Sequence, residues 1–183
     1  MKNIAALCKF SSILLILSLI FAGCHHDTLT DVEIQISPKN GFAVTHTFEN
    51  GVWTFPKIDD GIDKELLLSG TFPNTQDFYK LTVHVDFYDD IQANALPLDI
   101  TTTSPDGNSM QSTSVLVEFK DGEDITSLGV ENGRKLFRAT KIIYPSKQFT
   151  DKGAYSFTVY SKYSKMSLKG IKSLTIAAQK VEK

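Results

Sequence analysis

Tyr79-Lys80-Leu81-Thr82-Val83-His84-Val85-Asp86-Phe87-Tyr88 alternates between apolar and polar side chains over its first nine positions. Side chains of a β-strand point alternately to opposite faces, so this pattern predicts a strand with one face in a core. Valine, threonine and aromatic residues, which suit a pleated and half-buried surface, dominate the stretch. It therefore predicts a protein built from β-sheet.

The same period of two recurs on both sides of this stretch. It is found in the windows Val32–Ile36, Phe42–Phe48, Leu96–Ile100, Val115–Phe119, Tyr155–Val159 and Leu174–Ile176. His46 falls in the apolar register of its window, and Pro97 lies inside another, where proline favours an edge strand or a bulge. We expect no helix after residue 24, because no later stretch has a convincing helical period.

Turn-forming residues separate these windows. They occur at Pro38–Gly41, Glu49–Gly51, Ser104–Gly107 and Asp121–Gly122. Glycine and asparagine tolerate positive φ, and proline fixes φ at a value that suits a turn. Many short strands with regular turns predict an all-β, antiparallel β-sandwich.

One motif refines this prediction. Asp151-Lys152-Gly153-Ala154-Tyr155-Ser156-Phe157 resembles the tyrosine corner of immunoglobulin-like, Greek-key sandwiches. In such a corner Gly153 allows a sharp turn, and the Tyr155 hydroxyl bonds to a nearby backbone group. A plain hairpin can give the same pattern.

The N-terminal residues read as an export signal. Lys2 and Lys9 lie on the N-terminal side of an apolar run that carries no charge from Phe10 to Gly23. The run is shorter than the roughly 20 residues that span a bilayer, and small residues end it, as in a secretory signal. Phe21-Ala22-Gly23-Cys24 resembles a bacterial lipobox, although leucine is more usual where Phe21 stands.

The lipobox resemblance implies a lipid anchor. The Cys24 thiol would receive a diacylglycerol, cleavage would follow Gly23, and the new amino group would be acylated, for example by palmitate. The alternative is an ordinary signal peptide with a chance cysteine. We expect a lipoprotein signal peptide over 1–23, an acylated tether over 24–31 and a single β-sandwich domain over 32–183.

Cysteine use fits this division. Cys8 would leave with the signal and Cys24 would carry the lipid, so none of the 2 cysteines remains for a disulfide. The 160 residues from Cys24 onward are enough for one packed core. No second apolar stretch reaches membrane-spanning length, so we expect the N-terminal lipid to be the membrane contact.

Charge is distributed unevenly along the chain. Residues 24–133 carry 19 acids and 5 bases, whereas residues 134–183 carry 12 bases and 2 acids. The two parts either neutralise each other within one fold or form a basic face for lipid head groups or an acidic partner. We expect no nucleic-acid partner for an exported protein.

Catalytic and metal-binding motifs are not found. There is no G-x-S-x-G and no glycine-rich phosphate loop. His25 and His26 lie on the tether without further ligands, and Asp59, Asp60 and Asp63 lack the order of a calcium loop. We therefore expect no catalytic residues, no metal, no cofactor and no enzymatic activity.

Aromatic side chains offer another route to function. Exposed rings bind sugars by stacking or anchor protein partners. Trp53, the only tryptophan, and Tyr88, Tyr160 and Tyr163 are the candidate contacts for a partner or a glycan. The alternative for Trp53 is burial in the core of the sandwich.

Several short motifs follow one another in a distinctive order. After the lipobox and Trp53 come Tyr79–Val85, Asn94–Ile100, Pro105–Gly107, Tyr144–Pro145, Gly153–Phe157, Met166, Leu168, Gly170–Ile171 and Val181–Lys183. This order resembles that of the GldH-type gliding-motility lipoproteins of the Bacteroidetes. Family members tend to carry an arginine after the Tyr-x-Leu strand, where this chain has Asp86–Asp90.

The resemblance implies a non-enzymatic envelope lipoprotein. It would belong to a gliding-motility-type machinery, bind other envelope proteins and sit on the cell membrane through its lipid. We expect the outer membrane, with the leaflet left open. The alternative function is a glycan-binding surface lipoprotein for nutrient capture.

Overall fold

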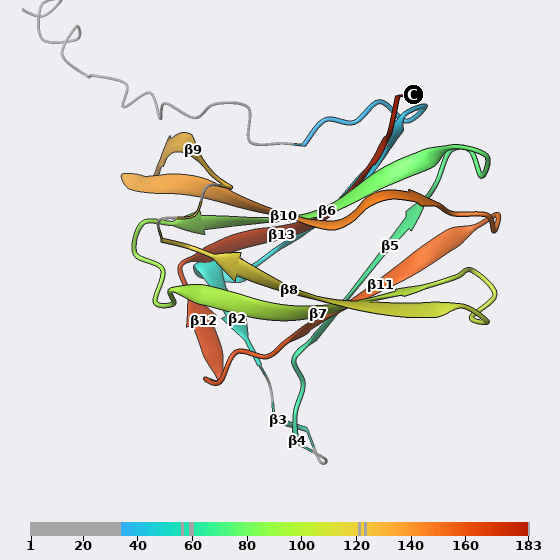
Figure 1. Ribbon diagram of the computed structural model, residues 1–183. Coiled ribbons are helices and arrows are strands. Elements are labelled where there is room, and N and C mark those ends of the chain that lie inside the picture. Colours follow the sequence, from blue (N-terminus) through green and yellow to red (C-terminus); the bar gives the residue numbers. More distant parts are fainter. Residues whose placement is uncertain (1–33, 56, 59–60, 121, 123, 183) are drawn as a thin grey trace, which may run out of the picture.

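The computed structural model describes residues 34–55, 57–58, 61–120, 122 and 124–182. Two antiparallel β-sheets in this part of the chain pack face to face around one core (Figure 1). Its only helical element is the short 3-10 turn η1 (Glu49–Gly51), so none of its helices has the length and apolarity to cross a membrane. The prediction of an all-β sandwich is confirmed, and the immunoglobulin-like topology stays a prediction.

The larger sheet has five strands. Their spatial order is β1 (Gly41–Thr47), β13 (Ile171–Lys180), β6 (Phe78–Tyr88), β10 (Arg134–Gln148) and β9 (Ile125–Glu131). β6, which carries the strictest alternation, lies at the centre and pairs with β13 and β10. β13 in turn pairs with β1.

The smaller sheet has four strands, in the order β5 (Glu65–Thr71), β11 (Ala154–Ser161), β7 (Ala95–Thr103) and β8 (Met110–Glu118). Two short ladders lie at one end of the sandwich. β2 (Val52–Thr54) pairs with β12 (Ser167–Lys169), and β3 (Lys57–Ile58) pairs with β4 (Gly61–Ile62).

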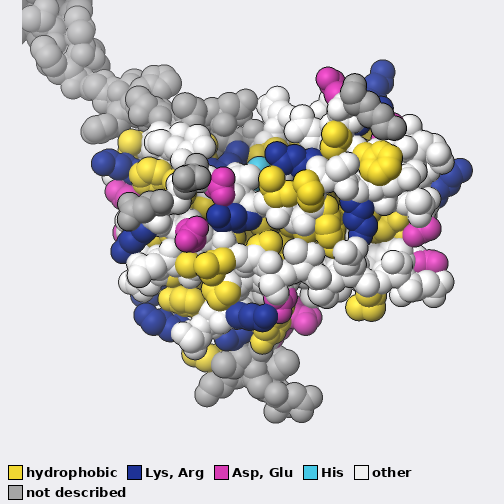
Figure 2. Space-filling model, viewed as in Figure 1, with side chains coloured by type: hydrophobic (Ala, Val, Ile, Leu, Met, Phe, Trp, Pro, Cys, Tyr) yellow, Lys and Arg dark blue, Asp and Glu magenta, His cyan; other side chains and the backbone are white. Residues whose placement is uncertain are grey.

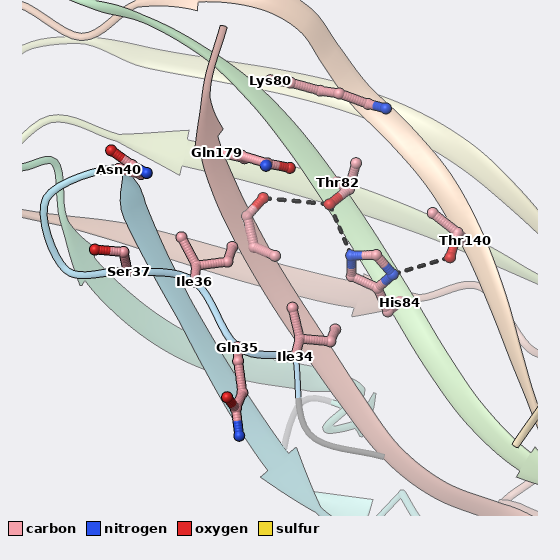
Figure 3. A pocket seen from close by; sticks show the side chains of 11 residues that line it. Ile34, Gln35, Ile36, Ser37, Asn40, Lys80, Thr82, His84, Thr140 and Gln179 are labelled. Carbon is pink, nitrogen blue, oxygen red and sulfur yellow. Dashed lines mark hydrogen bonds between the residues drawn. The ribbon is translucent and has the colours of Figure 1, made fainter. Parts of the chain in front are cut away.

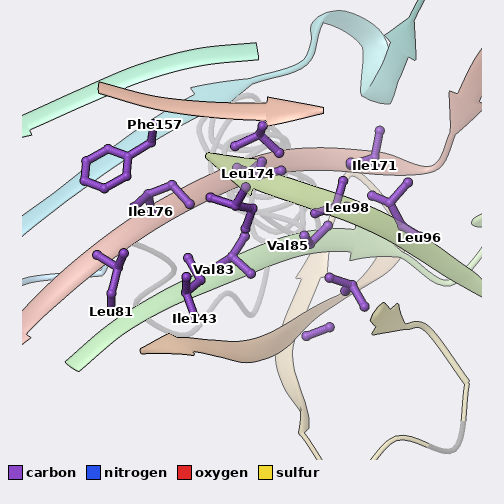
Figure 4. Packing of buried hydrophobic residues seen from close by; sticks show 14 of the residues in the cluster. Leu81, Val83, Val85, Leu96, Leu98, Ile143, Phe157, Ile171, Leu174 and Ile176 are labelled. Carbon is purple, nitrogen blue, oxygen red and sulfur yellow. The ribbon is translucent and has the colours of Figure 1, made fainter. Parts of the chain in front are cut away.

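The core lies between the inner faces of the two sheets (Figure 4). Leu81, Val83 and Val85 of β6 point into it, and Leu98 of β7 and Phe157 of β11 meet them from the other sheet. All five side chains are buried. The alternation in the sequence therefore marks the core face correctly, and burial of these apolar side chains is the main stabilising term.

The tyrosine corner forms as predicted. The Asp151 backbone N–H donates to the Tyr155 hydroxyl oxygen at 3.0 Å, and that hydroxyl lies 3.2 Å from Asp151 Oδ2. Tyr79 makes a second, similar contact, because its hydroxyl accepts from the Asn74 N–H and donates to the Asn74 carbonyl. Both tyrosines thus fix a loop to the strand that follows it.

Two predicted turns are also confirmed. The Gly107 N–H donates to the Ser104 carbonyl at 2.9 Å, which closes the turn between β7 and β8. Asn50 and Gly51 take φ values of 54° and 66°, the left-handed region that these residues tolerate.

The predicted strand at Val32–Ile36 is wrong for its described residues. Ile34 and Ile36 are half-buried and Gln35 is exposed, so burial alternates, but no ladder forms there. The segment instead lies across the outer face of the five-stranded sheet. Val32 lies outside the described residues.

Pro97 corrects another prediction. β7 is an internal strand between β11 and β8, and its register with β8 is unbroken. The ladder with β11 ends at Leu98, and the Pro97 carbonyl accepts the Lys162 N–H at 2.9 Å just beyond it. The missing N–H of Pro97 therefore interrupts no paired part of the ladder.

Candidate functional site

A hollow of about 360 Å³ opens on the outer face of the five-stranded sheet (Figure 3). Its floor comes from β6, β10 and β13, and the segment that contains Ile34 and Ile36 forms one wall. The polar lining residues are Gln35, Ser37, Asn40, Lys80, Thr82, His84, Thr140 and Gln179. Lys80 is the only charged side chain among them.

His84 lies at the floor of this hollow with both ring nitrogens occupied. The Thr82 hydroxyl donates to the Ala177 carbonyl at 3.3 Å, so its oxygen accepts from His84 Nε2 at 2.8 Å. Nδ1 then accepts from the Thr140 hydroxyl at 2.9 Å. Burial, and then the charge of Arg138, lower the pKa of His84 to about 4, so the ring is neutral at pH 7.

Asp86 and Arg138 form an ion pair next to His84 on the same face. Arg138 Nε donates to Asp86 Oδ1 at 2.6 Å and Nη2 donates to Oδ2 at 2.8 Å. The Ser173 hydroxyl adds a bond of 3.2 Å to Oδ2. The side chains of His84, Asp86 and Arg138 are thus all held by hydrogen bonds within the protein. We call these bonded side chains on the outer face of the five-stranded sheet the polar network.

A second, wider depression lies at one end of the sandwich, between β1 and β5. Phe48, Trp53 and Leu66 supply apolar surface, and Glu49, Asp63 and Glu65 supply carboxylates. His46 also lines it, with its ring 4.9 Å from that of Phe48. We call this the β1–β5 cleft.

The candidate aromatic contacts separate into buried and exposed rings. Trp53 is 5% exposed and packs between Phe48 and Phe55, with ring centroids 4.9 and 5.2 Å away. The burial alternative for Trp53 is therefore correct, although the residue also lines the cleft. Tyr160 is 38% exposed and lies on the outer face of the four-stranded sheet.

Tyr88 and Tyr163 are buried, contrary to expectation. The Tyr88 hydroxyl donates to Glu131 Oε2 at 2.6 Å, and the Arg134 guanidinium stacks 3.7 Å from its ring centroid. Burial, followed by the hydrogen bond to Glu131, raises the pKa of Tyr88 to about 12. Neither tyrosine offers the open ring face that sugar stacking requires.

The ion pairs support the alternative in which the acidic and basic parts of the chain neutralise each other within one fold. Every ion pair among the described residues joins a base from residues 134–183 to an acid from residues 24–133. These pairs are Arg134–Asp90, Arg138–Asp86, Lys141–Glu118, Lys141–Asp124, Lys162–Asp99, Lys172–Glu131 and Lys180–Asp77. On the face seen in Figure 2, basic and acidic side chains are accordingly interspersed.

No group of three or more histidine, cysteine or acidic side chains that could hold a metal occurs within the described residues. Asp63 Oδ1 accepts the Glu65 N–H at 3.0 Å, so it caps the start of β5. The lipobox with Cys24, the tether histidines His25 and His26, and Asp59 and Asp60 lie outside the described residues.

Sequence reasoning missed the hollow around His84 because it joins strands far apart in the chain. It missed the β1–β5 cleft because the turns between β1 and β5, and not a local pattern, bring its lining residues together. Trp53, His46, His84 and Asp63 were named beforehand, but the sequence did not predict which of them lie together. No protein-family model and no curated protein matches the chain.

Proposed function

We propose that this protein is a lipid-anchored envelope protein whose sandwich docks other proteins without catalysing a reaction. The observation that carries the proposal is Phe21-Ala22-Gly23-Cys24 at the end of an uncharged apolar run, ahead of a single sandwich. Several acyl chains together hold a domain stably at a membrane, where a single chain binds only marginally. In this setting the sandwich acts as a scaffold for contacts.

The organisation of the polar groups supports docking over chemistry. His84 is neutral with both nitrogens bonded, and Asp86 is bound by Arg138 and Ser173. General acid–base catalysis needs a group free to reach its substrate. We infer from the GldH-type resemblance that the docked proteins belong to a gliding-motility-type machinery in the outer membrane.

Crosslinking in native envelopes tests this proposal. Tagged protein is crosslinked, and its neighbours are identified by mass spectrometry beside a Cys24→Ala control. We expect a specific set of envelope proteins of a motility or secretion machine, lost in the control. Recovery of the same proteins from both samples would refute anchor-dependent docking.

Tyr160 favours a second candidate function, the capture of glycans at the cell surface. Its exposed ring lies on the outer face of the sheet, opposite Asp99 in the register of β11 and β7. Asp99 accepts a hydrogen bond from the Ser114 hydroxyl and forms an ion pair with Lys162. An aromatic ring among hydrogen-bonding side chains suits a sugar. In the crosslinking experiment this function predicts enrichment of glycan transporters and its loss in Tyr160→Ala.

A further inference from the structure

The free edges of the two sheets are protected to different degrees. An exposed edge strand presents unpaired backbone groups and invites another strand, so proteins blunt it with bulges, proline or lysine. β9 is blunted by Gly129, with φ of 110°, and by a register shift opposite Leu136 and Phe137. The part of β10 beyond β9 contains Pro145 and two register shifts.

β8 and β1 are protected by neighbouring groups. Lys141 pairs with Glu118, and Lys147 donates to Gln111, so lysine side chains from β10 bridge to both ends of β8. Beside β1, the segment Ile34–Pro38 shares a depression with Ala43. Lysine side chains and covering segments are common ways to protect an edge.

β5 has none of these protections. It pairs with β11 in one continuous register, and the described residues provide no strand on its other side. Its sequence Glu-Leu-Leu-Leu-Ser-Gly-Thr contains neither lysine nor proline. Leu67 is 68% exposed on its outer face. An apolar edge of this kind is a template for strand addition.

The β1–β5 cleft lies directly beside this edge. β1 and β5 are in contact where the Phe42 ring covers Gly70, so closely that a Cβ at Gly70 would overlap the ring. At the other end of the two strands, the cleft is lined by His46 and Thr47 of β1 and by Glu65 and Leu66 of β5. A strand that followed β5 would therefore place side chains in the cleft.

The cleft has an uncompensated negative charge among its described side chains. Glu49, Asp63 and Glu65 line it, and none of them has an ion pair within the described part of the chain. The ammonium of the adjacent Lys64 pairs with none of the three, since it donates to the Tyr163 carbonyl at 2.5 Å and lies over the Phe55 ring. Such a surface favours a basic ligand.

We propose that the edge of β5 and the β1–β5 cleft bind an extended, basic segment of a partner protein by strand addition. This inference rests on the docking role proposed above and names its site. Backbone groups of the segment would pair with β5. Its apolar side chains would contact Phe48, Trp53 and Leu66, and its lysine or arginine side chains would meet the three carboxylates.

Peptide binding to the full-length protein in detergent tests this site. The probe is a synthetic ten-residue peptide of alternating lysine and valine, and the matched control alternates glutamate and valine. Trp53 is the only tryptophan, so its fluorescence reports on the cleft. We expect saturable binding of the lysine peptide, at least tenfold tighter than the glutamate peptide, with slowed amide exchange along β5.

Matched variants locate the site. Leu67→Lys introduces a positive charge of the kind that protects edge strands from pairing. Met110→Lys makes the same change on β8 at a similarly exposed position, since Met110 is 70% exposed and Leu67 is 68% exposed. We expect Leu67→Lys to weaken binding at least tenfold and Met110→Lys to leave it unchanged. Glu65→Lys should weaken the binding of the lysine peptide and strengthen the binding of the glutamate peptide.

Three results would overturn the site: no saturable binding of the lysine peptide, equal binding of both peptides, or equal loss in both lysine variants. Crosslinking separates this inference from the docking role. If wild type and Leu67→Lys capture the same envelope neighbours, docking stands and the β5 site is wrong. If wild type captures no specific neighbour, the docking role fails, and the peptide result alone decides whether β5 accepts a strand.

Discussion

The side chains on the outer faces of the two sheets differ in their burial and in their hydrogen bonds. On the five-stranded sheet Asp86 and Thr175 are buried, and each bonds to a neighbouring side chain. On the four-stranded sheet Leu67 and Tyr160 are exposed among threonine and serine side chains. The same alternating pattern thus gives buried, hydrogen-bonded polar side chains on one sheet and exposed apolar side chains on the other.

The largest expected effect breaks the polar network at its ion pair. Asp86→Ala leaves the partly buried Arg138 guanidinium without this carboxylate, so we expect a loss of up to about 3–5 kcal/mol in the free energy of unfolding. Asp99→Ala, at the more exposed Lys162–Asp99 pair of the other sheet, should cost less than about 1 kcal/mol. Urea denaturation measures both, and equal losses would contradict the contrast.

Acid should weaken the same network through His84. The pKa of His84 is about 4 in the folded protein and about 6.5 when unfolded, so the unfolded state binds more protons between these values. Stability should therefore fall as pH drops through this window, by roughly 1–3 kcal/mol. Urea denaturation at several pH values should show that His84→Gln loses this component. His46→Gln, at an exposed position, should keep it.

A smaller effect is expected for a single hydroxyl. Thr175 Oγ1 lies 2.8 Å from Thr45 Oγ1 on the outer face of the five-stranded sheet. Thr175→Val removes this hydrogen bond and should lower the free energy of unfolding by about 1 kcal/mol. Thr158, on the outer face of β11, has no such partner among the described residues, so Thr158→Val should change stability by less than about 0.5 kcal/mol. Thermal unfolding of the two variants provides the comparison, and a greater loss at Thr158 would count against it.

The smallest effect on stability is expected at the exposed apolar positions. Leu67→Lys and Met110→Lys each should change the free energy of unfolding by less than about 0.5 kcal/mol, because both side chains are mostly in water. A loss above 1 kcal/mol at Leu67, measured by urea denaturation, would mean that β5 relies on this side chain for packing.

The strands that follow a strict local pattern were predictable, and one long strand was not. Tyr79–Tyr88 alternates without interruption, and it forms the central strand β6. β10 lies beside it, yet its register shifts on both sides of Tyr144, next to Pro145, and these shifts hide the period of two. β5 was missed because Leu66–Leu68 is a continuous apolar run, with Leu67 outside and its neighbours inside.

The candidate surfaces depend on contacts that no local pattern encodes. Trp53 could be recognised as unusual, but its position in the β1–β5 cleft follows from how two unpaired edges approach at Phe42 and Gly70. The pairing of Asp86 with Arg138 likewise depends on the register of β6 and β10. Residue type was therefore informative, whereas the grouping of residues required the fold.

The place of β13 between β1 and β6 has a consequence for the order of folding. β1 pairs only with β13 among the described strands, and β13 is the last of them in the sequence. When a chain becomes available from its N-terminus onward, β1 therefore has no strand to pair with until β13, near the C-terminus, is available. Such long-range pairing slows folding, so the edge that β1 closes should be among the last parts of the sandwich to form.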